Sequence, residues 1–114
     1  MIATAASLFV ALLHFGFMVL ETFMWTTPRV RRIFGQTVEG AATTKLLAAN
    51  QGVYNGALAL CLAVSAVMDE RFAIRLLLGF VIVVGIYGAV SVKRSILFIQ
   101  ALPAALALLA TYEH

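Results

Sequence analysis

Two side chains that can exchange protons, His14 and Glu21, lie in an otherwise apolar N-terminal stretch of this 114-residue sequence. At about 100° per residue they fall on one face of a helix, together with Met18 and Trp25. An imidazole and a carboxylate on one face can act as general acid and general base. His14 and Glu21 are therefore the candidate catalytic residues.

A second group of polar side chains interrupts another apolar stretch at NQGVYNG, residues 50–56. Amide and phenol groups of this kind can bind and orient an oxygen atom of a substrate. Single polar residues also stand in two later apolar stretches. The candidate ligand-binding residues are Trp25, Asn50, Gln51, Tyr54, Asn55, Tyr87 and Gln100.

The composition indicates that a membrane surrounds these residues. Hydrophobic residues make up 63% of the chain and charged residues 11%, whereas soluble domains have roughly 45–50% and 25%. A membrane span needs about 20 mostly apolar residues, and consecutive spans joined by short turns are antiparallel neighbours. The sequence predicts an all-α membrane protein, one transmembrane domain over 1–114 that folds as a four-transmembrane-helix up-down-up-down bundle with helices at about 3–25, 46–68, 72–92 and 96–112.

The only long predicted connection covers residues 26–45 and contains TTPRVRRIFG. Proline suits the first turn of a helix, and arginines alternating with large apolar residues are typical of an amphipathic helix in the membrane interface. An ordinary basic loop would have a similar composition. Both interpretations remain open at this point.

The distribution of basic residues predicts the orientation in the membrane. Six cations fall on one side of the predicted bundle, at Arg29, Arg31, Arg32, Lys45, Lys93 and Arg94. The other side has only Arg71 and Arg75, offset by Asp69 and Glu70. Because cytoplasmic loops are enriched in Lys and Arg, we expect a multi-pass protein of the bacterial inner membrane with both termini facing away from the cytoplasm.

The formal net charge of +3 arises from this skew and favours contacts with anionic membrane lipids. The basic residues lack the interleaved aromatic side chains on which a single-stranded nucleic acid would stack. No nucleic-acid partner is expected.

The helix rise of about 1.5 Å per residue places five polar side chains at nearly one depth, about 6–8 Å below the inner interface. This polar layer consists of Glu21, Asn50, Gln51, Tyr87 and Gln100. Unpartnered polar groups in hydrocarbon cost several kcal/mol each, so we expect the layer to face the bundle interior or a cavity. His14, Tyr54 and Asn55 would extend it toward mid-membrane.

Two interpretations of the polar layer remain open. An ionisable residue within a membrane span is a functional-site hypothesis by default, which favours a binding site around Glu21. Alternatively, the amides only join helices, at about 0.6 kcal/mol per hydrogen bond on average, and Glu21 reaches the interface or pairs with Arg29.

Packing signals complete the predicted bundle. Gly52 and Gly56 are four residues apart, and Gly85 and Ala89 repeat that small-residue spacing, which lets helices approach closely. Pro103 is expected to bend the last helix, because it removes a backbone hydrogen bond.

No cofactor or metal is expected. The single cysteine, Cys61, lies in a predicted span, and the histidines are only His14 and His114, too few for a conventional zinc site. Motifs of soluble enzymes, such as a phosphate-binding loop or a nucleophile elbow, are absent from the sequence.

The order of motifs resembles a family of small bacterial integral membrane proteins, the domain of unknown function 1304. The resemblance covers almost the whole chain, and NQGxYN is its most specific part. It implies a four-helix inner-membrane protein of this length and supplies no activity. The matching positions are His14, Glu21, Trp25-Thr26-x-Pro28, Phe34-Gly35, Asn50-Gln51-Gly52-x-Tyr54-Asn55, Tyr87-Gly88 and Gln100-x-x-Pro103.

Three functions are compatible with these observations. The first is a cytoplasm-facing intramembrane pocket that binds a small amphiphilic or lipid-like molecule, with acid/base chemistry by His14 and Glu21. The second, by analogy with small multidrug-resistance transporters, is a proton-coupled exporter that uses Glu21 within a homodimer. The third is an accessory subunit of a larger membrane complex.

Overall fold

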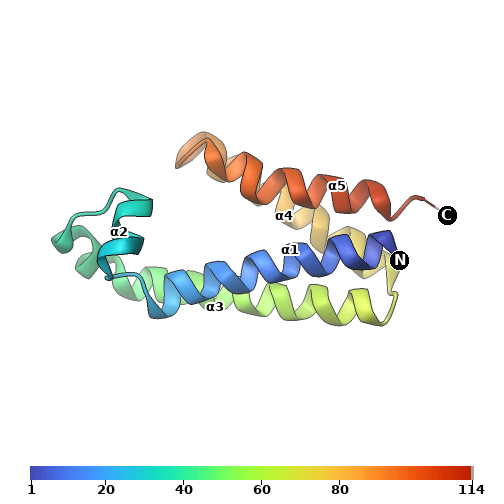
Figure 1. Cartoon of the computed structure of the whole chain (residues 1–114), viewed down its shortest axis with the longest axis horizontal. Helices are drawn as coiled ribbons and strands as arrows, with labels where there is room; N and C mark the ends of the chain where they lie inside the picture. The colour runs from blue at the N-terminus through green and yellow to red at the C-terminus, as the bar shows by residue number, and fades with distance from the viewer. Residues whose placement is uncertain (114) are drawn as a thin grey trace. The chain divides into compact units, whose positions relative to one another are not determined.

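The computed structural model describes residues 1–113, which contain helices and no strand. The all-α prediction is therefore confirmed. In chain order the elements are α1 (Ile2–Met18), η1 (Val19–Phe23), α2 (Pro28–Phe34), α3 (Val38–Val67), α4 (Arg71–Ser91), η2 (Leu97–Ala101) and α5 (Leu102–Ala110), as Figure 1 shows. The elements η1 and η2 are π-helical turns that continue directly from α1 and into α5.

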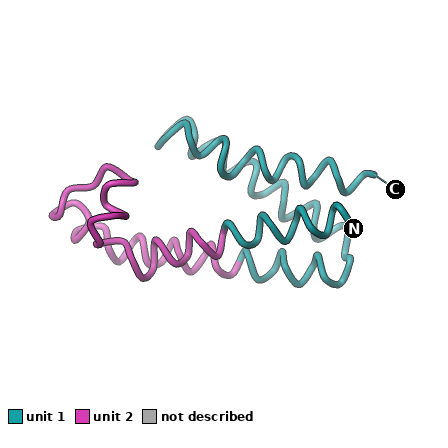
Figure 2. The backbone as a smooth tube through the Cα atoms, viewed as in Figure 1, with its two compact units in different colours: residues 1–13, 58–114 teal, residues 14–57 magenta. Residues whose placement is uncertain are grey.

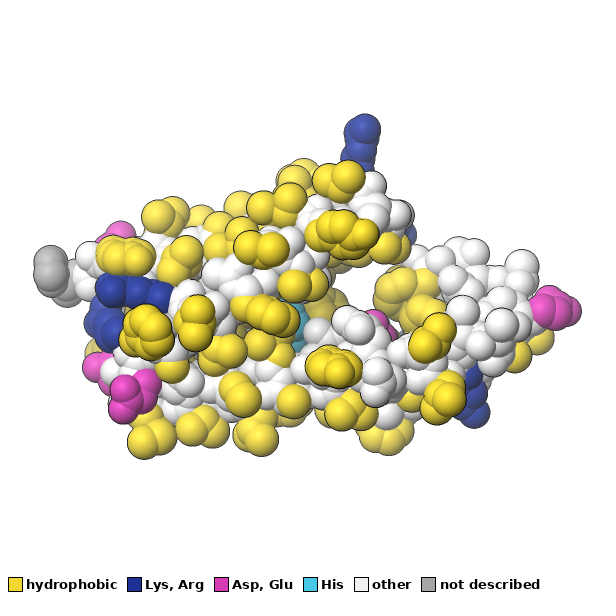
Figure 3. Space-filling view, turned by 180° about the vertical axis from the view of Figure 1, so that it is seen from behind, with side chains coloured by type: hydrophobic (Ala, Val, Ile, Leu, Met, Phe, Trp, Pro, Cys, Tyr) yellow, Lys and Arg dark blue, Asp and Glu magenta, His cyan; other side chains and the backbone are white. Residues whose placement is uncertain are grey.

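Three helical segments are long and apolar enough to cross a membrane: Ile2–Phe23, Val38–Val67 and Arg71–Ser91. The last segment, Leu97–Ala110, is apolar but shorter. Many large hydrophobic side chains are exposed, among them Phe23, Phe80 and Val90, as lipid-facing helices require. Figure 3 shows hydrophobic side chains distributed over much of the visible surface.

The chain forms two compact units, which are coloured separately in Figure 2. Unit 1 comprises residues 1–13 and 58–114, and unit 2 comprises residues 14–57. In unit 1, α4 packs against η2 and α5. A Cβ atom added to Gly85 would lie 3.0 Å from the Cβ atom of Ala101, so this glycine permits the close approach that small residues give to membrane helices.

The buried faces in unit 1 follow from residue spacing. On α4, residues Ile74, Leu78, Val81 and Gly85 are buried and recur every three or four positions, as one side of a helix requires. The facing segment supplies small buried residues at Ala101, Ala104 and Ala107. Large side chains of α4 thus pack against alanines.

In unit 2, the end of α1 and the turn η1 pack against the middle of α3. A Cβ atom at Gly56 would clash with Met18, and one at Gly52 would clash with Thr22. The predicted use of these two glycines as a close-packing surface is confirmed. Their four-residue spacing matches that of Met18 and Thr22, so the two helices meet along one line of contacts.

The basic connection contains a short helix, α2, and the location of this helix in the membrane interface stays a prediction. The Thr27 hydroxyl accepts a hydrogen bond from the Val30 N–H, which is a helix N-cap, and Pro28 occupies the first turn. The helix ends at Gly35, whose φ of 65° is a left-handed conformation that favours glycine. Val30 is 0% exposed, so α2 has a buried apolar side.

The predicted start of the second long helix was wrong. The structure begins α3 at Val38 rather than Leu46, which shortens the connection predicted over 26–45. The Thr37 hydroxyl accepts a hydrogen bond from the Gly40 N–H at 2.9 Å. Thr43 and Thr44 donate their hydroxyls to the carbonyls four residues earlier, each at 2.8 Å. These bonds satisfy the threonine hydroxyls within the helix. A hydropathy pattern counts threonine as polar and does not reveal such bonds.

Candidate functional site

The structure joins two of the candidate residues directly. Glu21 lies in η1 and Asn55 lies in α3, and the Asn55 Nδ2 donates a hydrogen bond to Glu21 Oε1 at 2.5 Å. Both side chains are half-buried. Hydrogen bonds to a carboxylate are shorter and stronger than those between neutral groups. This pair is the polar centre of unit 2.

Glu21 sits in an unusual backbone conformation. A π-helical turn closes its hydrogen bonds over five residues instead of four, and such turns occur frequently at functional sites. The α-helix that contains His14 ends at Met18, so the angular count of 100° per residue applies only up to that point. The prediction that His14 and Glu21 lie on one face assumed an unbroken α-helix. The π-helical turn η1 changes the direction in which the Glu21 side chain leaves the helix.

Close backbone packing holds η1 in position. A Cβ atom at Gly52 would lie 3.0 Å from the Thr22 backbone nitrogen and 3.1 Å from the Glu21 Cβ atom. The Thr22 hydroxyl donates a hydrogen bond to the Ala49 carbonyl at 3.1 Å. Gly52 therefore determines how near the Glu21 side chain comes to α3.

His14 is the most deeply buried candidate residue, at 1% exposure. Its ring meets the Phe17 ring edge to face at a centroid distance of 5.1 Å. His14, Met18 and Thr22 follow one another at four-residue intervals along the segment that packs on α3. His14 is thus buried within this segment, while its catalytic role stays a prediction.

Trp25 connects α2 to α3. Its indole Nε1–H donates to the Thr44 hydroxyl at 3.0 Å, and its ring contacts the Phe34 ring at a centroid distance of 5.0 Å. The polar atom of this side chain is thus occupied by a contact within the protein. The sequence analysis did not select Thr22 or Thr44. The only signals in the sequence were that Thr22 directly follows Glu21 and that Thr44 lies in a polar stretch.

Three candidates in α3 point away from the packed interior of unit 2. Asn50 and Gln51 are exposed, and Tyr54 is 66% exposed. In the part of the chain that the structure describes, their side chains form no hydrogen bond to another residue. Among residues 1–113, they do not join helices by hydrogen bonds.

Tyr87 and Gln100 belong to unit 1. Tyr87 is 74% exposed on α4, and Gln100 is half-buried within η2. Glu21 and Gln100, the polar residues predicted for the first and last spans, thus both occupy π-helical turns. The single polar layer predicted across four helices stays a prediction, whereas the Glu21–Asn55 pair within unit 2 is observed.

In the described part of the chain, the candidate residues coincide with neither a metal site nor one of the two cavities described below. No group of three or more His, Cys, Asp or Glu side chains among residues 1–113 could hold a metal ion. Unit 1 contains an open groove of about 730 Å³ on α4 and a smaller cavity of about 230 Å³ beside Met1 and Arg71. None of the candidate residues lines either of them.

Long apolar helices, three of them long enough to cross a membrane, and glycine-mediated packing are the features of a helical membrane protein. The chain belongs to the family described as Protein of unknown function (DUF1304), which matches residues 8–112. Uncharacterized protein YpaA of Lactococcus lactis subsp. lactis (strain IL1403) is 34% identical over 110 residues, which cover 93% of this chain and 92% of YpaA. No solved structure gives a significant match. The resemblance of the motifs to this family is confirmed.

Proposed function

We propose that this protein binds the polar end of a small amphiphilic or lipid-like molecule at the Glu21–Asn55 pair, in a cytoplasm-facing pocket within the membrane. The observation that carries the proposal is a half-buried carboxylate in an apolar helix, hydrogen-bonded to a neighbouring helix at 2.5 Å. An acidic group in such a segment is costly and is expected where it has a function.

The chemistry of the pair narrows the class of ligand. Asn55 donates to Glu21 Oε1, while Glu21 Oε2 and Asn55 Oδ1 accept no hydrogen bond from residues 1–113. Two adjacent acceptors favour a ligand that donates hydrogen bonds. An amphiphile with a hydroxyl or ammonium group at its polar end fits this requirement, and its apolar part would lie among the helices or lipids.

A catalytic form of the proposal adds His14. Its imidazole has one nitrogen that donates and one that accepts a proton, and Glu21 supplies a second proton-exchanging group. Together they would transfer protons on the bound molecule without a cofactor.

The proposal includes four membrane crossings, with Leu97–Ala110 as the fourth. This segment is apolar, and Ile96 and Tyr112 extend its apolar character at both ends. Antiparallel packing of α4 against η2 and α5 supports a return across the bilayer. Both termini would face away from the cytoplasm of a bacterial inner membrane, because the basic residues gather in the connections at the opposite ends of the helices.

Cysteine labelling tests this topology in a Cys61→Ala background. A cysteine at Ser95 should react with an impermeant maleimide only after spheroplasts are opened, whereas one at Asp69 should react in intact spheroplasts. Equal labelling of the two positions in intact spheroplasts would refute the orientation.

The binding site is tested by mass spectrometry of small molecules and lipids that co-purify with the protein. A species enriched with the wild type should be lost from Glu21→Gln and from Asn55→Leu. It should remain with Glu39→Gln, which removes an exposed carboxylate at the start of α3. Identical profiles for all four proteins would overturn the proposal.

The same variants separate binding from transport. A proton-coupled exporter would discharge a pH gradient across proteoliposomes when a cationic substrate is added, and Glu21→Gln would abolish that discharge. An enzyme would convert its amphiphile in detergent, where no gradient exists.

A second candidate function, assembly with another copy or another subunit, is favoured by the exposed Asn50, Gln51 and Tyr54 side chains. Polar groups on a lipid-facing helix gain hydrogen bonds when a second helix covers them. Cross-linking in membranes would detect this assembly. Cysteine at Ala57, which follows Asn50 by seven residues and Tyr54 by three and so lies near their face of α3, should form adducts that Asn50→Leu weakens if the surface is an interface.

A further inference from the structure

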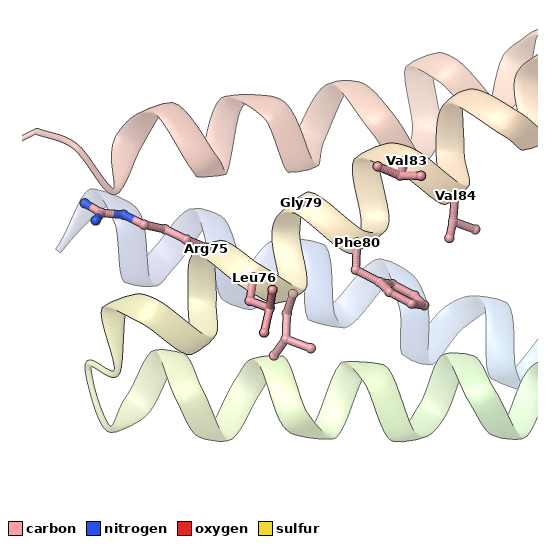
Figure 4. Close-up of a pocket in the computed structure, with 7 residues that line it drawn as sticks. Arg75, Leu76, Gly79, Phe80, Val83 and Val84 are labelled. Carbon is pink, nitrogen blue, oxygen red and sulfur yellow. The ribbon is translucent and has the colours of Figure 1, made fainter.

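The helix α4 has an open apolar groove with a cation at one end. Its volume is about 730 Å³, and all the residues that line it belong to α4 in unit 1. Figure 4 labels the lining residues that the argument uses: Arg75, Leu76, Gly79, Phe80, Val83 and Val84.

Gly79 creates the hollow in this groove. A Cβ atom at that position would have no other atom within 4 Å, so the glycine is not required by packing within the chain. The neighbouring Leu76 and Phe80 side chains are 63% and 56% exposed. The groove can therefore receive an apolar chain from outside the protein.

Arg75 is held rigidly at the end of the groove. Its Nε–H donates to the Thr111 hydroxyl at 3.0 Å, and an Nη2–H donates to the Thr111 carbonyl at 2.9 Å. The guanidinium carbon lies 3.8 Å from the centre of the Tyr112 ring. Arg71, one helical turn earlier, also donates to the Thr111 carbonyl.

Arg75 retains binding capacity after these contacts. A guanidinium has five N–H donors, and the two bonds to Thr111 use two of them. Among residues 1–113, no carboxylate forms an ion pair with Arg75, while the carboxylate of Asp69 lies 3.7 Å from Arg71. The remaining Arg75 donors are therefore available to an anion.

We propose that this groove binds one anionic phospholipid, with the phosphate on Arg75 and an acyl chain along Gly79 to Val84. The nine-residue rise from Arg75 to Val84 is about 14 Å, close to half of a hydrocarbon core of about 30 Å. The groove therefore matches the acyl chain of one leaflet. Arginine near a helix end commonly extends its guanidinium to the interface, where lipid phosphates lie.

The lipid site is independent of the Glu21 site. The two sites share no residue. The lipid site offers hydrogen-bond donors to an anion, whereas the Glu21–Asn55 pair offers hydrogen-bond acceptors. Loss of a co-purifying molecule from Glu21→Gln would leave the lipid site intact, so failure of either proposal can be recognised separately.

The test compares retention of phosphatidylglycerol and phosphatidylcholine with identical acyl chains, measured by native mass spectrometry of the purified protein in neutral detergent. The wild type should retain one phosphatidylglycerol about tenfold more tightly than phosphatidylcholine. Arg75→Gln should abolish this preference. Gly79→Leu should weaken the binding of both lipids about tenfold, because the leucine side chain fills the groove.

Gly16→Leu is the matched control, because a Cβ atom at Gly16 also meets nothing within 4 Å and Gly16 lies outside the groove. It should bind like the wild type. Gly79→Leu leaves both Arg75 and Thr111 in the chain, so it tests the groove even if Arg75→Gln does not fold. Wild-type retention by Gly79→Leu, or displacement of the lipid by glycerol phosphate alone, would overturn the proposed acyl-chain site.

Discussion

The Asn55 amide and the Glu21 carboxylate are joined by a hydrogen bond of 2.5 Å between α3 and the π-helical turn η1. In an apolar segment, removal of either partner leaves the other polar group unsatisfied, which costs about 1–3 kcal/mol. Removal of both leaves no such group. The two residues should therefore act as one energetic unit.

A double-mutant cycle tests this coupling. Glu21→Leu and Asn55→Leu should together destabilise the protein less than the sum of the single changes, with an interaction energy of about 1–3 kcal/mol. Unfolding in mixed micelles of neutral detergent and dodecyl sulfate gives the four free energies. A cycle with Glu39→Leu in place of Glu21→Leu should be additive, and additivity in both cycles would refute the coupling.

Gly52→Ala should destabilise the packing of α3 against η1 by about 1–3 kcal/mol, because the added methyl group overpacks the contact. The relevant neighbour is the Thr22 backbone nitrogen, 3.0 Å from the new Cβ atom, which cannot rotate away as a side chain can. Thermal unfolding would detect the loss. Gly16→Ala, with no atom within 4 Å of its Cβ position, should be neutral or stabilising; equal stability of the two variants contradicts the prediction.

Thr44→Val should detach the indole N–H of Trp25 and cost about 0.5–1.5 kcal/mol. Since the chain has 1 tryptophan, its fluorescence reports this contact directly. We expect a shift in the emission maximum for Thr44→Val. Thr43→Val removes a hydroxyl that bonds only to the Glu39 carbonyl of the same helix, and it should leave the emission unchanged. Matching spectra for both variants would show that the indole bond does not form in solution.

Pro103→Ala should convert η2 toward a regular α-helix. Proline lacks the N–H that would bond four residues back and its ring crowds that carbonyl, and η2 ends directly before the helical turn that contains Pro103. An alanine restores the donor toward the Ile99 carbonyl, so its amide should be protected from hydrogen exchange. Stability should rise by about 1–3 kcal/mol.

Pro28→Ala is the control for that change, because a proline in the first turn of a helix replaces an N–H that has no helical partner. It should not raise stability. Rapid exchange of the amide at position 103 would show that the π-helical turn has another cause.

The sequence allowed prediction of the apolar helices and of the close contacts of Gly52 and Gly56, since each depends on local composition or spacing. The short helix at Pro28–Phe34 was one of two interpretations that the sequence left open. The start of α3 at Val38 could not be predicted from hydropathy. Thr43 and Thr44 are polar by composition, yet their hydroxyls bond within the helix. A pattern of residue types does not reveal which hydrogen bonds a threonine will make.

The site was predictable only in part. Glu21 and Asn55 were both candidates, but their pairing depends on the angle at which each side chain leaves its helix. The π-helical turn changes that angle at Glu21 and has no simple sequence signature. Asn50, Gln51 and Tyr54 are polar residues like Asn55, but they lie at exposed positions of α3. Only the packing of unit 2 distinguishes these positions from the position of Asn55.

The helix α3 has 30 residues and is about 45 Å long, whereas a bilayer has a hydrocarbon core of about 30 Å. An upright α3 extends about 15 Å past that core, and its polar start is the part that suits water. The bond from Trp25 to Thr44 would then lie at the level of the lipid headgroups. A protein made almost wholly of membrane helices would thus present a small folded surface to the aqueous phase, within reach of macromolecules that never enter the bilayer.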